Sequence, residues 1–300
     1  MFLVILLFAL FGAVCSVAKL SLTYASPLFI IGSRMSLAGL ILLGYHFIRY
    51  RENFKFTAKQ LLLLFLLGTF NIYLTNIFVF YALGELDSFK TSFIYNLSPF
   101  MSALFSYFVF SEVLSKNQWI GLAIGFMGFL TLAADDFYFN DWSSFSYGHL
   151  IMLFSVMSSV YGWILMRQLV YENGCSTTFA NGAGMLIGGC MALLHSFIEE
   201  KWDPIPVVDY VGFLQCSLFL IIISNFVCYN LYGYLLKKYT ATFMTFAGFL
   251  TPLFTVFFSS MFLDEIVTRN FFIALFIVLG GLLLFYKDEL MQESPLKVTS

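Results

Sequence analysis

Apolar residues in this chain form long, nearly uninterrupted runs, separated by short polar connections. A helix needs about 20 apolar residues to cross the roughly 30 Å hydrocarbon core of a bilayer. Such runs cover residues 2–21, 28–49, 60–82, 89–110, 118–134, 147–169, 177–198, 210–235, 241–262 and 270–286. The pattern predicts an all-α integral membrane protein with ten transmembrane helices.

Composition supports a membrane protein and excludes a cytosolic globular fold. Hydrophobic residues make up 60% of the chain and charged residues 11%, against about 25% charged in soluble domains. The five cysteines show no CxxC spacing, and the three histidines lie near the ends of the apolar runs. We therefore expect no disulfide framework, no metal site and no cofactor.

The basic residues predict the orientation. If the N-terminus is cytoplasmic, the basic residues outside the runs fall mainly on the cytoplasmic side, and Lys90, Lys201 and Arg269 fall on the other. This positive-inside bias, with an even number of helices, predicts that both termini are cytoplasmic. The short loops favour a bacterial-type inner membrane, although an organelle membrane stays open. Without a basic stripe we expect no nucleic-acid partner, and the protein could be a monomer or a homodimer.

The two halves of the chain repeat one another. A shift of 150 residues pairs Gly12 with Gly162 and Gly32 with Gly182. A shift of 153 pairs Tyr81 with Tyr234, Ser98-Pro99 with Thr251-Pro252, Glu112 with Glu265 and Gly128 with Gly281. Five helices per copy is an odd number, so the second copy would enter the membrane from the opposite side. We expect one repeat over 1–136, an inverted repeat over 147–289 around a central cavity, and a short cytoplasmic tail over 290–300.

These motifs also resemble a known family. The sequence Ala9-Leu10-Phe11-Gly12, then Lys19, Arg34, Ser98-Pro99 and Glu112, with Pro252, Glu265 and Gly281 in the second copy, is similar to the ten-helix drug/metabolite transporters with two EamA domains. Lys19 and Arg34 become Leu169 and Gly184 in the second copy, which departs from a strict repeat. The resemblance implies a carrier with a cavity between helices 1, 3, 4, 6, 8 and 9. Its substrates would be amino acids or nucleotide-type metabolites, including S-adenosylmethionine.

Polar and aromatic side chains inside the predicted helices are the candidates for substrate contact. In lipid they must face inward, where they either line a cavity or bond to a neighbouring helix. A cavity lined by tyrosine and tryptophan would suit a planar ring or an organic cation. The expected substrate-binding residues are Asn71, Tyr73, Asn76, Tyr95, Asn96, Ser98, Tyr161, Trp163, Asn225 and Tyr229.

For some charged residues and for two prolines the sequence leaves two possible roles open. Lys19 and Arg34 could anchor an anionic group of the substrate, or they could extend to the interface beside their helices. Pro99 and Pro252 interrupt apolar runs and predict either hinges or static kinks. Glu112 and Glu265 are expected to bind backbone donors or a cation at tight turns.

The predicted helices hold no carboxylate at mid-membrane depth, where proton relays are usually found. We therefore expect a transporter that moves a small organic metabolite by alternating access, through facilitated diffusion or exchange. A lipid flippase or scramblase on the same fold is the alternative. No catalytic cluster is present, so an enzyme is not expected. The expected partners are the substrate and membrane lipids.

Overall fold

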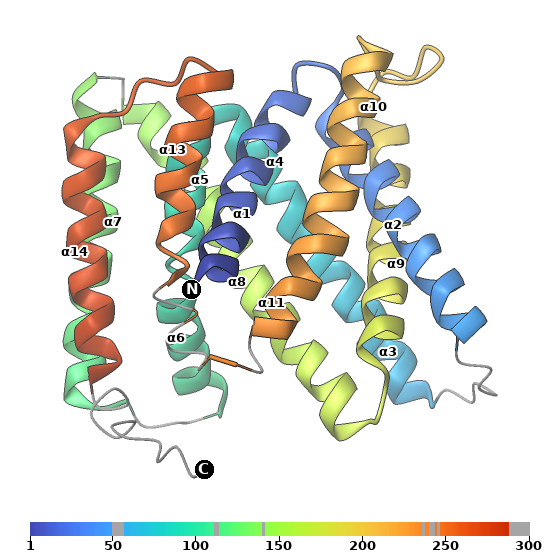
Figure 1. Ribbon diagram of the computed structural model, residues 1–300, viewed down its shortest axis with the longest axis horizontal. Helices are drawn as coiled ribbons and strands as arrows, with labels where there is room; N and C mark the ends of the chain where they lie inside the picture. The colour runs from blue at the N-terminus through green and yellow to red at the C-terminus, as the bar shows by residue number, and fades with distance from the viewer. Residues whose placement is uncertain are drawn as a thin grey trace.

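A computed structural model describes residues 1–49, 57–110, 114–139, 142–235, 238–239, 244 and 247–287, which are helices and their connections (Figure 1). In the first half these are α1 (Phe2–Ser21), α2 (Pro27–Arg49), α3 (Ala58–Leu67), η1 (Gly68–Leu74), α4 (Thr75–Glu85), α5 (Ser88–Tyr95), α6 (Ser98–Phe110) and α7 (Lys116–Phe139). The predicted tail and Glu112 lie outside these residues.

The second half is also helical in its described part. Its elements are α8 (Trp142–Arg167), η2 (Gln168–Glu172), α9 (Thr177–Glu199), α10 (Tyr210–Phe219), η3 (Leu220–Cys228), α11 (Tyr229–Leu235), α13 (Leu250–Phe262) and α14 (Arg269–Phe285). Six helices in the described part are long and apolar enough to span a bilayer: Phe2–Ser21, Pro27–Arg49, Ala58–Glu85, Tyr147–Val170, Thr177–Glu199 and Tyr210–Cys228. An all-helical membrane protein is confirmed, whereas the count of ten spans stays a prediction.

Two long helices change to π-helical geometry in their middle, at η1 and η3. The shift of 153 that aligns the two halves moves 68–74 onto 221–227, which lies inside η3. A π-helical turn leaves the regular hydrogen-bond ladder and often occurs at functional sites. Helix α8 bonds to the η1–α4 segment, because Ser158 Oγ donates to Phe70 O in η1 at 2.7 Å and Ser155 Oγ donates to Thr75 O, in the first residue of α4, at 2.9 Å.

Glycines allow two pairs of helices to pack closely at the two sides of the bundle, α2 with α9 and α7 with α14 (Figure 1). A Cβ at Gly39 would lie 2.6 Å from Leu186 N, and one at Gly189 would lie 2.5 Å from Ser36 N. Such contacts exclude every larger side chain and bring the backbones together. We call these pairs the α2–α9 seam and the α7–α14 seam.

The α7–α14 seam has the same construction. A Cβ at Gly128 would lie 3.0 Å from Ala274 O, and one at Gly281 would lie 2.8 Å from Gly121 O. In each seam one helix belongs to the first half of the chain and the other to the second. The seams therefore hold the two halves together at both sides of the molecule.

The helices around the two prolines are broken rather than merely bent. The run 89–110 divides into α5 and α6, with a turn at Asn96 and Leu97, so the prediction of one continuous helix is wrong. Pro99 falls in the first turn of α6, where a helix needs no N–H donor. Pro252 likewise falls in the first turn of α13. A hinge at either proline stays a prediction.

One end of the bundle carries the connections 22–26, 86–87, 200–209 and 263–268 and is called the Glu265 end below (Figure 1). At this end Glu200 caps α2, because its two carboxylate oxygens accept hydrogen bonds from Leu28 N at 2.8 Å and Phe29 N at 3.1 Å. A carboxylate satisfies the free N–H groups of a helix start and interacts favourably with its dipole. The loop after α9 is thus fixed to the start of α2.

Candidate functional site

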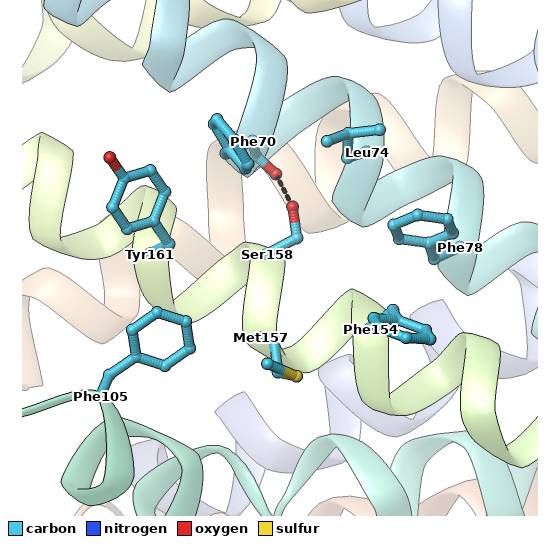
Figure 2. A pocket seen from close by; sticks show the side chains of 8 residues that line it. All are labelled: Phe70, Leu74, Phe78, Phe105, Phe154, Met157, Ser158 and Tyr161. Atoms are coloured by element: carbon cyan, nitrogen blue, oxygen red, sulfur yellow. Dashed lines mark hydrogen bonds between the residues drawn. The ribbon is translucent and has the colours of Figure 1, made fainter. Parts of the chain in front are cut away.

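A groove of about 400 Å³ lies between α8, the η1–α4 segment and α6 (Figure 2). Helix α8 contributes one face, formed by Phe154 and the residues three, four and seven positions after it. The η1–α4 segment contributes three residues spaced four apart, beginning at Phe70. The volume falls within the roughly 300–1,000 Å³ of small-molecule sites. The groove is lined by Phe70, Leu74, Phe78, Phe105, Phe154, Met157, Ser158 and Tyr161.

Aromatic rings dominate this groove. Tyr161 lies edge-on to Phe70, with centroids 4.8 Å apart, and stacks with Phe105 at 6.4 Å. Figure 2 shows Phe105 on a different element from the other rings, below Tyr161. Aromatic faces attract planar rings and cations. The lining can therefore hold a flat, weakly polar or cationic group.

Several of the predicted contact residues bond to neighbouring helices. Tyr95 Oη and Ser159 Oγ are 2.8 Å apart and join α5 to α8. Tyr73 Oη and His195 Nδ1 are 3.0 Å apart and join η1 to α9. Asn96 Nδ2 donates to Ser92 O within its own segment. Of the two roles that the sequence left open, the structure shows helix–helix bonding for Tyr73 and Tyr95.

The remaining predicted residues are dispersed over the bundle. Tyr161 lines the groove, Asn71 packs on Gly162, and Ser98 opens α6. Trp163 is 46% exposed. Asn225, in η3, is buried, and its Nδ2 has no hydrogen-bond partner among the residues that the structure describes. The side chain of Tyr229 lies outside the described part. Substrate contact by any of these residues stays a prediction.

Arg34 is buried between α2 and the η1–α4 segment, with 4% of its surface exposed. Its Nη2 donates to Asn76 Oδ1 at 3.0 Å, and its guanidinium carbon lies 5.7 Å from the centre of the Phe80 ring. A buried guanidinium is costly unless it is hydrogen-bonded, and the ring adds cation–π attraction. This buried position of Arg34 differs from the position at the membrane interface, which was one of the two roles that the sequence left open.

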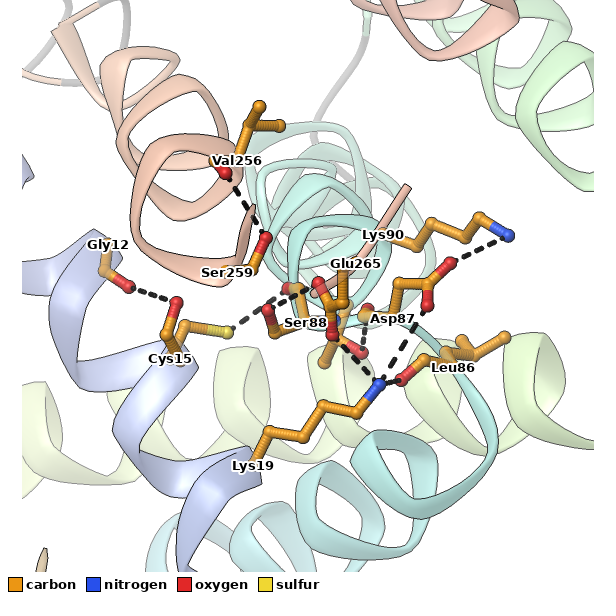
Figure 3. A network of polar contacts seen from close by, with 12 residues as sticks. Gly12, Cys15, Lys19, Leu86, Asp87, Ser88, Lys90, Val256, Ser259 and Glu265 are labelled. Carbon is orange, nitrogen blue, oxygen red and sulfur yellow. Dashed lines mark hydrogen bonds and ion pairs between the residues drawn. The ribbon is translucent and has the colours of Figure 1, made fainter. Parts of the chain in front are cut away.

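Lys19 takes part in a polar network at the Glu265 end (Figure 3). Its ammonium lies 2.9 Å from Glu265 Oε1 and donates to Leu86 O at 2.8 Å. The same carboxylate accepts hydrogen bonds from Ser88 N and Ser88 Oγ, both at 2.8 Å. We call Lys19, Ser88 and Glu265 the latch, because they join α1, the start of α5 and the loop after α13.

The latch is well shielded from solvent. The side chain of Glu265 is 4% exposed and that of Lys19 is 24% exposed. Burial alone would raise the pKa of the Glu265 carboxyl, but the hydrogen bonds from Lys19 and Ser88 outweigh it. The pKa therefore lies below its ordinary value of 4.5. The carboxylate is charged at neutral pH, and the prediction that Glu265 binds backbone donors or a cation is confirmed.

Sequence reasoning missed most of the groove. Phe70, Phe105 and Phe154 belong to 39 phenylalanines, so aromatic spacing alone could not distinguish lining residues from lipid-facing ones. One usable signal was the pair Ser155 and Ser158, which are three apart on α8. Both serines bond to the backbone of η1 and α4 and so mark the face of α8 that meets them.

Comparison with known proteins identifies the family. The profile of the EamA-like transporter family matches residues 1–134 and 146–287. The chain belongs to the EamA-like transporter family. Its relatives in this family are transporters, so this protein is a multi-pass membrane transporter and not an enzyme.

Individual EamA relatives refine this assignment. The S-adenosylmethionine/S-adenosylhomocysteine transporter of Chlamydia muridarum is 35% identical over 92% of this chain and 88% of its own length. The protein of the same name from Chlamydia trachomatis serovar L2 is 33% identical over 92% and 86%. The uncharacterized inner membrane transporter YedA of Escherichia coli K12 is 23% identical over 93% and 87%. A crystal structure with 15% identity has the same fold, at a TM-score of 0.65 over 97% of this chain and 98% of the other.

Proposed function

We propose that this EamA transporter exchanges S-adenosylmethionine for S-adenosylhomocysteine. The observation that carries the proposal is the 35% identity, over nearly the whole chain, to a Chlamydia muridarum transporter with that name. We also propose that the exchange takes place across a bacterial-type inner membrane, with both termini in the cytoplasm and the Glu265 end on the opposite side of the membrane. The substrate would be a nucleoside that carries an amino acid and a sulfonium cation.

The chemistry of the groove supports such a substrate. An adenine ring can stack on Tyr161, Phe70 or Phe105, and a sulfonium cation gains about 0.5–2 kcal/mol over an aromatic face. Because both exchanged solutes carry the same adenosine, one aromatic site can bind either of them. Exchange of one for the other then needs no coupled ion.

The arrangement of the two seams supports the inverted repeat that such a carrier needs. Gly39 meets Leu186 while Gly32 meets Leu193, so equivalent helices of the two halves run antiparallel. A two-fold axis that relates antiparallel helices turns one half upside down relative to the other. Inverted repeats can adopt two related packings around a site between them.

Purified protein in sealed vesicles tests the proposal. Uptake of labelled S-adenosylmethionine should be several-fold faster into vesicles preloaded with S-adenosylhomocysteine than into empty ones. Labelled amino acids and free nucleosides should enter poorly. Equal uptake with and without preloading would refute exchange, and no uptake above protein-free vesicles would refute the substrate.

The groove also gives a specific reason to test lipids. Phe154 and Met157 are 54% and 37% exposed, so one wall of the groove lies open at the side of the bundle. A flippase or scramblase needs such a lateral opening. The same vesicles with a fluorescent phospholipid separate the two functions, because a metabolite exchanger leaves the distribution of lipid between leaflets unchanged.

A further inference from the structure

The two seams obey the repeat symmetry residue by residue. Under the shift of 150, Gly39 becomes Gly189 and Leu186 becomes Ser36; the structure contains both contacts, Gly39 with Leu186 and Gly189 with Ser36. In a two-fold arrangement, if residue i meets j, then the equivalent of i meets the equivalent of j. The α2–α9 seam satisfies this condition.

The α7–α14 seam satisfies the same condition under the shift of 153. Gly128 becomes Gly281, and Ala274 is the equivalent of Gly121. The contact between Gly128 and Ala274 O is matched by the contact between Gly281 and Gly121 O. The sides of the molecule are therefore symmetric in their contacts.

The centre of the molecule breaks the symmetry. A Cβ at Gly12, on α1, would lie 2.7 Å from Phe254 Cβ and 2.8 Å from Thr255 N, on α13. A Cβ at the equivalent Gly162, on α8, would lie 2.4 Å from Asn71 Cβ, on η1. By the repeat, Gly162 would instead meet α6, the equivalent of α13. Two equivalent glycines thus pack on helices that are not equivalent.

The burial of neighbouring residues shows the same difference. Thr255 is fully buried and its hydroxyl donates to Ser92 Oγ at 3.2 Å, joining α13 to α5. Its equivalent on α6, Ser102, is exposed. At the Glu265 end α1, α5 and α13 are closed together, whereas α6 touches α8 through the stacked rings of Phe105 and Tyr161 and a groove stays open beside that contact.

From this broken symmetry we infer that the structure is one of two states of the carrier and that the latch of Lys19, Ser88 and Glu265 holds it closed at the Glu265 end. In the other state the halves exchange packings. Helix α8 closes on α6, with Gly162 against Met101 and Ser102, and α1 leaves α13 as the latch opens. The inference rests on the proposed alternating transport but names the contacts that change.

The two states also differ in charge. Lys19 in the first half corresponds to Leu169 in the second, which is fully buried among apolar residues. The closure of α8 on α6 therefore has no lysine at the position equivalent to Lys19. An ion pair shielded from water is strengthened by its surroundings, so the latch biases the protein toward closure at the Glu265 end.

Thiol accessibility tests the inference without any substrate. Cys15 Sγ donates to Ser88 O at 3.3 Å, directly beneath the latch (Figure 3). In a protein with Cys175, Cys190, Cys216 and Cys228 replaced by alanine, Cys15 reports opening at the Glu265 end to a membrane-impermeant thiol reagent. In a second protein, with Cys15 also replaced, Ser102→Cys reports opening at the groove.

Glu265→Gln exchanges a charged hydrogen-bond acceptor for a neutral one, which weakens each bond by about half. Cys15 labelling should rise roughly five- to thirtyfold, and Ser102→Cys labelling should fall. Glu200→Gln is the matched control, because it alters a helix cap at the same end but in the α2–α9 seam, and both rates should stay unchanged. A rise at both cysteines would show general loosening and overturn the inference, as would no change at either.

The two labelling rates are measured without substrate, so they do not depend on whether the protein transports S-adenosylmethionine. If labelling is reciprocal but no exchange occurs, the two states stand and the substrate is wrong. If exchange occurs and labelling is not reciprocal, the substrate stands and the assignment of the latch is wrong.

Discussion

The α2–α9 seam makes a quantitative prediction for Gly39→Ala. The added Cβ would lie 2.6 Å from Leu186 N and 2.8 Å from Gly182 O, which are backbone atoms that cannot rotate away. The helices must separate by several tenths of an ångström, and overpacking of this kind costs about 1–3 kcal/mol. Gly44→Ala, on the same helix, meets nothing within 4 Å. It should be neutral or stabilising by up to about 1 kcal/mol through better helix propensity.

Thermal unfolding in detergent measures the difference. A loss of about 1–3 kcal/mol corresponds to a decrease in Tm of roughly 2–10 °C for a chain of this size. Gly44→Ala should unfold at or slightly above the wild-type temperature. Equal Tm values for the two variants would refute the reasoning that Gly39 is required because a larger side chain would clash with the backbone of α9.

The remaining predictions concern the helix contacts, the groove and the latch. A double-mutant cycle of Tyr95→Phe and Ser159→Ala, followed by thermal unfolding, should give a coupling of about 0.5–1.5 kcal/mol, since the pair shares one hydrogen bond; a coupling of zero would contradict the contact. Tyr161→Leu should raise KM for S-adenosylmethionine roughly two- to thirtyfold, whereas Tyr161→Phe, which keeps the ring, should stay near wild type; equal losses would exclude ring stacking. The pKa of Glu265 is lowered by Lys19 and Ser88, with Asp87 and Cys15 nearby, so the latch should stay closed above pH 4.5 and weaken as pH falls below it. Cys15 labelling, normalised to free cysteine at each pH, should rise only in acid, and a rise between pH 6 and 8 would contradict this assignment.

The sequence predicted the parts of the fold that depend on hydrophobic length and on duplicated motifs. Apolar runs located the helices because lipid requires continuous apolar stretches. The shift that pairs Gly128 with Gly281 also predicted which glycines are equivalent, and these occur in the α7–α14 seam. Such features are local or periodic, so one chain is enough to show them.

The sequence could not predict which state the centre adopts or where the open space lies. Equivalent residues such as Gly12 and Gly162 have different neighbours, and repeat symmetry alone would give them the same ones. Likewise Tyr95 and Tyr161 lie on faces that both carry polar residues, yet one is bonded to Ser159 and the other lines the groove. These outcomes depend on packing between distant segments rather than on local pattern.

The two seams have a consequence for the connection between α7 and α8. Each seam joins a helix from one half of the chain to a helix from the other, at opposite sides of the molecule. The peptide link between the halves is therefore not what keeps them together. We therefore expect two separate polypeptides, one ending after α7 and one beginning before α8, to assemble through the two seams when a cell makes both.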